Sequence, residues 1–125
     1  MVAEFHRSFG LPMHASPTLV ISDELRQLRV DLLREEVQEF ADASERRDLT
    51  SIADALADIA YVTYGAAITY GIDLDAVLRE IHSSNMSKLD DGHPVLRDDG
   101  KVLKSPQYRP PLVDAVLSGQ LALPL

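Results

Sequence analysis

The chain has 125 residues, of which 46% are hydrophobic and 26% are charged, a balance typical of a globular domain rather than of a disordered chain. It contains no cysteine, which excludes disulfides and thiolate metal sites, and its net charge of -8 argues against binding to a nucleic-acid backbone. The sequence predicts neither a signal peptide nor an apolar stretch long enough to cross a membrane. We therefore expect one domain over residues 1–125 in a cytoplasmic protein that binds neither membrane nor nucleic acid.

The first half of the chain predicts two long helices. Residues 1–22 form a short amphipathic opening, followed by a loop rich in glycine and proline. Ser22 is a favourable N-cap for a helix over residues 23–44. A second helix is predicted to begin between residues 48 and 51 and to end at residue 70, because Gly71 suits the position that follows a helix.

The second half predicts shorter elements. Asp73 is a favourable cap for a third helix that continues to residue 88. Asp99-Gly100 separates two short apolar segments, which is the pattern of a β-hairpin. Prolines should keep residues 105–111 extended, and residues 112–119 predict a last short helix. The fold class is therefore all-α, a helical bundle with a short C-terminal hairpin or extended tail.

Carboxylates continue the apolar stripe of the first long helix. At about 100° per residue, Leu25, Leu28 and Leu32 share one face of that helix. The next residues on this face are the three glutamates Glu35, Glu36 and Glu39. Flanking apolar residues indicate that the face remains directed to the core, where carboxylates are costly to bury.

The other two helices show the same change from apolar to polar. The second is apolar on nearly all sides, which is typical of a buried helix, yet Asp54 and Asp58 lie one turn apart on it. The stripe of the third helix ends in Asn85 and Lys88. Three such helices indicate one shared polar pocket within the bundle.

A divalent hard cation would relieve the repulsion among these acids, since carboxylate oxygens are its preferred ligands. Mg²⁺ or Mn²⁺ suits an all-oxygen site, whereas the sequence lacks the cysteines of many zinc sites and the Glu-x-x-His pairs of di-iron bundles. Taken singly, each group has an ordinary explanation as solvated charge or as part of a helix end. The histidines His6, His14 and His93 are expected at the surface. The combination of acids on neighbouring helices favours the metal site.

Three segments together carry a resemblance to a known family. They are "LLREEVQEFADA", "SIADALADIAYVTYGAAITYGID" and "SNMSKLDDGHPVLRDDGKVLKSPQYRPP". In combination the chain resembles the MazG-like, all-α nucleoside triphosphate pyrophosphohydrolases, in particular the phosphoribosyl-ATP pyrophosphohydrolase-like branch, which is similar to dimeric dUTPases. The resemblance implies the bundle of that family over nearly the whole chain.

The resemblance also implies roles for individual residues. The family's Glu-x-x-Glu motif falls on Glu36 and Glu39, and the last acid of its Glu-x-x-Asp motif falls on Asp58. The first acid of that second motif is replaced by Ala55, so the remaining ligand or water-orienting base is Asp54 or Glu35, with Glu36 a further candidate for the base. The substrate-side residues implied are Asn85, Lys88, Lys101, Lys104 and Tyr108, the last three from the tail, acting in their own subunit or across a dimer interface.

The activity implied is metal-dependent cleavage between the α and β phosphates of a nucleoside triphosphate, with dUTP the preferred substrate, giving dUMP and pyrophosphate. Other targets remain open: dCTP, another non-standard nucleotide, or phosphoribosyl-ATP. A different class of function also stays open, because the loss of the acid at Ala55 is what a catalytically silent helical module would show. The apolar second helix predicts a homodimer or higher homo-oligomer.

Overall fold

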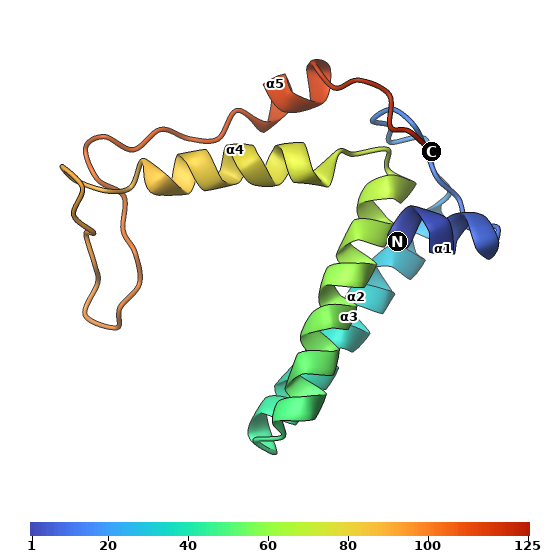
Figure 1. Cartoon of the computed structure of the whole chain (residues 1–125), viewed down its shortest axis with the longest axis horizontal. Coiled ribbons are helices and arrows are strands. Elements are labelled where there is room, and N and C mark those ends of the chain that lie inside the picture. Colours follow the sequence, from blue (N-terminus) through green and yellow to red (C-terminus); the bar gives the residue numbers. More distant parts are fainter. The chain divides into compact units, whose positions relative to one another are not determined.

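The computed structural model describes all 125 residues, and its five helices confirm the predicted all-α fold class (Figure 1). The chain divides into two compact units. The first comprises residues 1–72 and 121–125, and the second comprises residues 73–120. None of the helices is sufficiently long and apolar to cross a lipid bilayer.

The first unit is built on a helical hairpin. α2 (Asp23–Glu45) and α3 (Leu49–Thr69) lie side by side, and α1 (Val2–Ser8) packs against α3. Both long helices begin at side-chain caps, because Ser22 accepts a hydrogen bond from the backbone N–H of Leu25 and Asp48 accepts one from that of Ser51. The predicted bounds of both helices are therefore confirmed to within a few residues.

The loop between α1 and α2 is fastened to the end of α3. The backbone N–H of His14 donates to the carbonyl of Ile68, and that of Thr18 donates to the carbonyl of Tyr70, each at 2.9 Å. Gly71, at φ +72°, follows α3 in the left-handed conformation predicted for it. A Cβ at this position would lie 2.1 Å from the carbonyl oxygen of Ser16, so only glycine fits.

The second unit contains α4 (Leu74–Met86) and α5 (Val113–Ser118), which pack on each other. Asp73 caps α4 as predicted, accepting a hydrogen bond from the backbone N–H of Ala76. Between the helices, an antiparallel bridge joins Leu96 and Val102, which confirms a short hairpin around Asp99-Gly100.

Side chains tie the extended tail of the second unit to α4. The guanidinium of Arg109 pairs with the carboxylate of Glu80 at 3.0 Å, and the same carboxylate accepts the backbone N–H of Leu112 at 3.0 Å. The hydroxyl of the buried Ser84 donates to the carbonyl of Arg109 at 2.8 Å. These hydrogen bonds pair backbone polar groups of a segment that forms neither a helix nor a sheet.

The core of the single chain is small. Its buried hydrophobic residues are the three alanines Ala43, Ala55 and Ala67. Larger residues remain open to solvent, including Leu28 at 47% exposure, Val37 at 49% and Leu56 at 48%. Within one chain α3 is not buried on all sides, because its unit supplies only α1 and α2 to cover it.

Candidate metal centre

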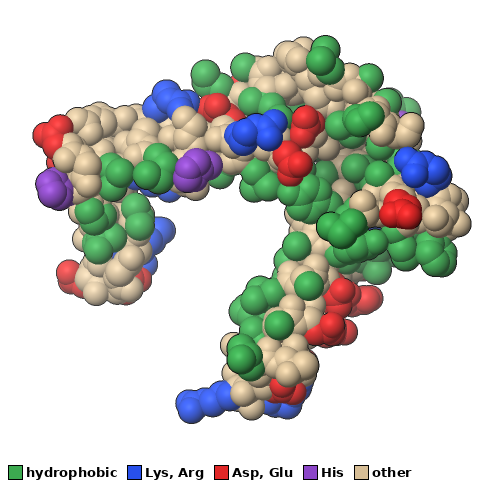
Figure 2. Space-filling model, in the orientation of Figure 1, with side chains coloured by type: hydrophobic (Ala, Val, Ile, Leu, Met, Phe, Trp, Pro, Cys, Tyr) green, Lys and Arg blue, Asp and Glu red, His purple; other side chains and the backbone are tan.

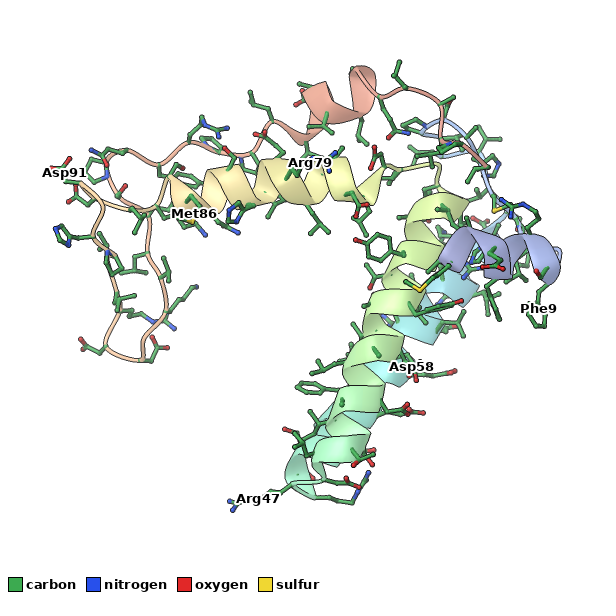
Figure 3. The ribbon with its side chains drawn as sticks, viewed as in Figure 1. Phe9, Arg47, Asp58, Arg79, Met86 and Asp91 are labelled. Atoms are coloured by element: carbon green, nitrogen blue, oxygen red, sulfur yellow. The ribbon has the colours of Figure 1, made fainter.

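Three of the predicted acids converge between α2 and α3. Glu36 and Glu39 lie three residues apart on α2 and therefore on neighbouring turns of one face. Asp58 lies on α3, where Figure 3 labels it. One carboxylate oxygen from each lies within 4.8 Å of the others. Glu39 and Asp58 are exposed, whereas Glu36 is partly buried.

The environment of Glu36 opposes its ionisation. Burial raises the pKa of the Glu36 carboxyl, and the charges of Glu39, Asp58 and Glu35 raise it further. The Oε2 atom of Glu36 is buried and has no hydrogen-bond partner. None of the four ion pairs in the structure brings a lysine or arginine to these acids. The acids therefore repel one another with no protein cation between them.

This donor set fits a divalent hard cation. Three carboxylates offer an all-oxygen site of the kind that Mg²⁺ and Mn²⁺ prefer. A cation among them would give the unpartnered Oε2 of Glu36 a partner and would offset the repulsion that raises its pKa. Glu36, Glu39 and Asp58 are thus the residues that could hold it.

Two further predicted acids lie near these three without joining them. Glu35 is exposed, and its charge contributes to the raised pKa of Glu36. Asp54 lies with Glu39 around a neighbouring cavity of about 180 Å³, whose other lining residues are Asp42, Arg46 and Ser51. Ala55, which replaces the family's acid, is only 2% exposed and belongs to the small core.

The residues predicted to contact substrate lie in the second unit. Asn85 is near the end of α4, and Lys88 follows that helix and is partly buried. Lys101 and Lys104 are exposed residues of the tail. The Nζ atom of Lys104 lies 4.8 Å from the centre of the Tyr108 ring, a cation–π contact within this unit. Their role toward a triphosphate stays a prediction.

Two buried basic side chains were not foreseen. His6 is 2% exposed, so its expected surface position is wrong, and Arg29 is 7% exposed, with a buried Nε atom that has no hydrogen-bond partner. Both pack against Gly65 of α3, where a Cβ would lie 3.0 Å from His6 Nε2 and 3.3 Å from Arg29 Nη1. Arg29 follows Leu25 by four residues and thus lies on the predicted apolar stripe, a signal that could have revealed it. The short opening segment gives no comparable signal for His6.

Comparison with known proteins places the chain in a family. The model of the family described as phosphoribosyl-ATP pyrophosphohydrolase matches residues 2–85, more than half of the chain. The chain belongs to this family. The family is part of the MazG-like all-α superfamily, so the resemblance read from the sequence motifs is confirmed. The matched range includes Glu36, Glu39 and Asp58.

A viral protein is also similar to this chain. It is the uncharacterized protein L479 of Acanthamoeba polyphaga mimivirus, which is 46% identical over 77 residues. The aligned part is 59% of this chain and 31% of the viral protein, so the chain matches about a third of its relative. Membership of the phosphoribosyl-ATP pyrophosphohydrolase family supports nucleotide pyrophosphohydrolase activity in general and does not indicate which nucleotide is cleaved.

Proposed function

We propose that this protein cleaves the bond between the α and β phosphates of a nucleoside triphosphate with the help of Mg²⁺ or Mn²⁺. Water attacks, and the products are a nucleoside monophosphate and pyrophosphate. The observation that carries the proposal is the convergence of Glu36, Glu39 and Asp58 around an unpartnered buried oxygen. The family supports the general reaction. The substrate we propose is dUTP, on the resemblance of the motifs to those of dimeric dUTPases.

Each acid has a separate task in this proposal. Glu36, Glu39 and Asp58 hold the cation, which when bound neutralises phosphate charge and makes a neighbouring water more acidic. Glu35 is exposed beside Glu36 and lies outside the group of three, so we assign it to accept the proton of the attacking water. Asp54, in the cavity that Glu39 also lines, is the alternative base. The lysines of the second unit would stabilise the charge of the leaving pyrophosphate. Among them, Lys88 lies just beyond the end of α4.

A second copy of the chain is part of the proposal. A hollow of about 590 Å³ on α2 is lined by the apolar Val30, Leu33 and Val37, together with Arg34 and Gln38. Leu28, Val30 and Val37 are each more than a third exposed. Apolar surface of this kind on a helical hairpin is covered in a homodimer by the same surface of the partner. Asn85, Lys101, Lys104 and Tyr108 would then contact substrate in their own subunit or in its partner.

Product analysis tests this function. Purified protein is incubated with Mg²⁺ or Mn²⁺ and a panel containing dUTP, dCTP, the canonical triphosphates and phosphoribosyl-ATP, and pyrophosphate is resolved from orthophosphate. We expect metal-dependent release of dUMP and pyrophosphate. Preference for phosphoribosyl-ATP would instead favour the substrate that gives the family its name. No turnover of any compound by folded protein would favour the silent helical module.

A matched pair of variants ties the activity to the acids. Glu36→Gln removes the charge of a proposed cation ligand, and we expect turnover to fall by at least about a hundredfold. Glu24→Gln changes an exposed glutamate in the first turn of the same helix, outside the site, and should leave turnover near that of the wild type. Equal activity of the two variants would contradict the proposed metal centre.

A further inference from the structure

An aromatic hollow lies between α1 and α3, next to the acids. It measures about 420 Å³, and its lining residues are Met1, Glu4, Phe5, Ser8, Phe9 and Tyr61. The first five of these recur at the spacing of one helix face, so α1 and its two capping residues present a single side to the hollow. Tyr61 forms the wall contributed by α3.

The three aromatic rings of this hollow support one another and remain open. Phe5 and Phe9 have ring centres 4.4 Å apart, and Phe5 meets Tyr61 edge to face at 5.7 Å and 81°. Phe9 is 67% exposed, and Phe5 and Tyr61 are each more than a third exposed. Rings fixed by mutual contact but open to solvent offer flat apolar faces at little cost in conformational entropy.

The hollow adjoins the acids through α3. Tyr61 follows Asp58 by three residues, so the two side chains are neighbours on the helix surface with a rise of about 4.5 Å between them. Figure 2 shows hydrophobic side chains beside acidic ones on this face of the first unit. A ligand bound at Asp58 therefore has the aromatic ring of Tyr61 within one helical turn.

We propose that the hollow lined by Phe5, Phe9 and Tyr61 holds the nucleobase of the substrate by stacking. This inference rests on the proposed function, because the triphosphate of the same molecule lies at Glu36, Glu39 and Asp58. A nucleotide has the required form, with an anionic end that needs a cation and a flat apolar end that needs a ring. The Glu4 carboxylate and the Ser8 hydroxyl at the hollow supply an acceptor and a donor for the edge of the base.

The test separates loss of base binding from loss of chemistry. Phe9→Ala removes the most exposed ring. We expect the KM for the nucleotide to rise about tenfold, as for loss of one base–aromatic stack, while kcat changes less. Inorganic triphosphate has no base, so its inhibition constant should remain that of the wild type. Calorimetric titration with the α,β-imido analogue of dUTP and Mg²⁺ should show the same tenfold loss of affinity without any turnover.

A second variant and a control complete the experiment. Tyr61→Ala changes the opposite wall and should raise the nucleotide KM in the same way, and circular dichroism verifies that both variants fold. Leu19→Ala alters a side chain that is 89% exposed outside the hollow and should have no effect. An unchanged nucleotide affinity in Phe9→Ala and Tyr61→Ala, with active wild type, overturns this inference and leaves the proposed function standing. A change of subunit number in these variants at wild-type nucleotide affinity also overturns it, since the rings then contact a second copy.

Discussion

Glu36 on α2 and Asp58 on α3 bring their carboxylates together across the helical hairpin, and the charge of Asp58 is one of the causes that raise the pKa of Glu36. The larger cause is burial of the Glu36 carboxyl. Without a cation, this arrangement opposes folding whenever Glu36 is ionised. The acids that suit the site for a metal therefore reduce the stability of the metal-free chain.

We predict that Glu36→Gln stabilises the metal-free protein at neutral pH. The pKa of Glu36 is raised in the folded state, so the unfolded chain loses its proton first as pH rises above the ordinary value of 4.5. Wild-type stability should fall as pH rises from there through the raised pKa, and below 4.5 this penalty is absent. In Glu36→Gln that part of the pH dependence should vanish. Urea unfolding of both proteins in EDTA, from below pH 4.5 to neutral pH, measures this pH dependence of stability.

Magnesium should make the wild type more stable than Glu36→Gln, the reverse of the order predicted in EDTA. Ligands that bind only the folded state stabilise it, so Mg²⁺ should raise the unfolding midpoint of the wild type but not that of Glu36→Gln. Glu24→Gln, which lies in the first turn of α2, should respond to Mg²⁺ as the wild type does. A Glu36→Gln protein that is less stable than the wild type in EDTA would show that the carboxylate is held by favourable contacts instead.

Restoring an acid at position 55 forms the second prediction. The resemblance to the family implies an acid at position 55, where this chain has Ala55, which is 2% exposed. Ala55→Glu should destabilise the metal-free protein by roughly 1–3 kcal/mol, because it buries a carboxylate on α3 three residues before Asp58. It should also tighten Mg²⁺ binding by about tenfold, since affinity rises with the number of charged ligands. Calorimetric titration and urea unfolding measure the two effects, and a variant with weaker Mg²⁺ binding would place position 55 outside the metal shell.

The long elements were predictable because their signals are local. Ser22, Asp48 and Asp73 cap the helices that follow them, and Gly71 ends α3. The acids followed from the same reasoning, since the helical period placed Glu36 and Glu39 on one face and a second acid-bearing helix had to lie beside it. The caps and the shared face of Glu36 and Glu39 depend on residues within one or two turns of each other, whereas Asp58 joins them through the pairing of α2 with α3.

Features that depend on tertiary packing were not predictable. His6 is buried because α1 packs against α3 at Gly65, a contact between residues far apart in the sequence. The contact of the half-exposed Phe5 ring with Tyr61 of α3 has the same origin. The apolar pattern of α3 predicts a helix that needs covering, but the pattern does not specify whether the covering comes from the same chain or from another.

The third prediction concerns His6 and the loss of stability at low pH. Burial lowers the pKa of His6, and the neighbouring Arg29 from α2 lowers it further, although a hydrogen bond with the carbonyl of Pro12 acts in the opposite direction. The unfolded chain therefore takes up a proton before the folded one, and stability should be lost as pH falls below about 6.5 toward the lowered pKa. His6→Gln should lose less stability than the wild type between pH 7.5 and 5.5. His93→Gln, at an exposed position, serves as control, and identical pH profiles of wild type and His6→Gln would contradict a buried neutral imidazole.

The last prediction tests whether a second copy covers α2. Val37 is 49% exposed and lines the apolar hollow of that helix with Val30 and Leu33. Val37→Lys would bury an unpaired ammonium in the proposed interface, so we expect dimer dissociation to become at least about tenfold easier in sedimentation velocity. Leu19→Lys, at a more exposed apolar residue outside the hollow, should sediment like the wild type. If Val37→Lys retains the subunit number of the wild type, the hollow on α2 faces solvent, and the covering of α3 must come through its other exposed residues, such as Leu56.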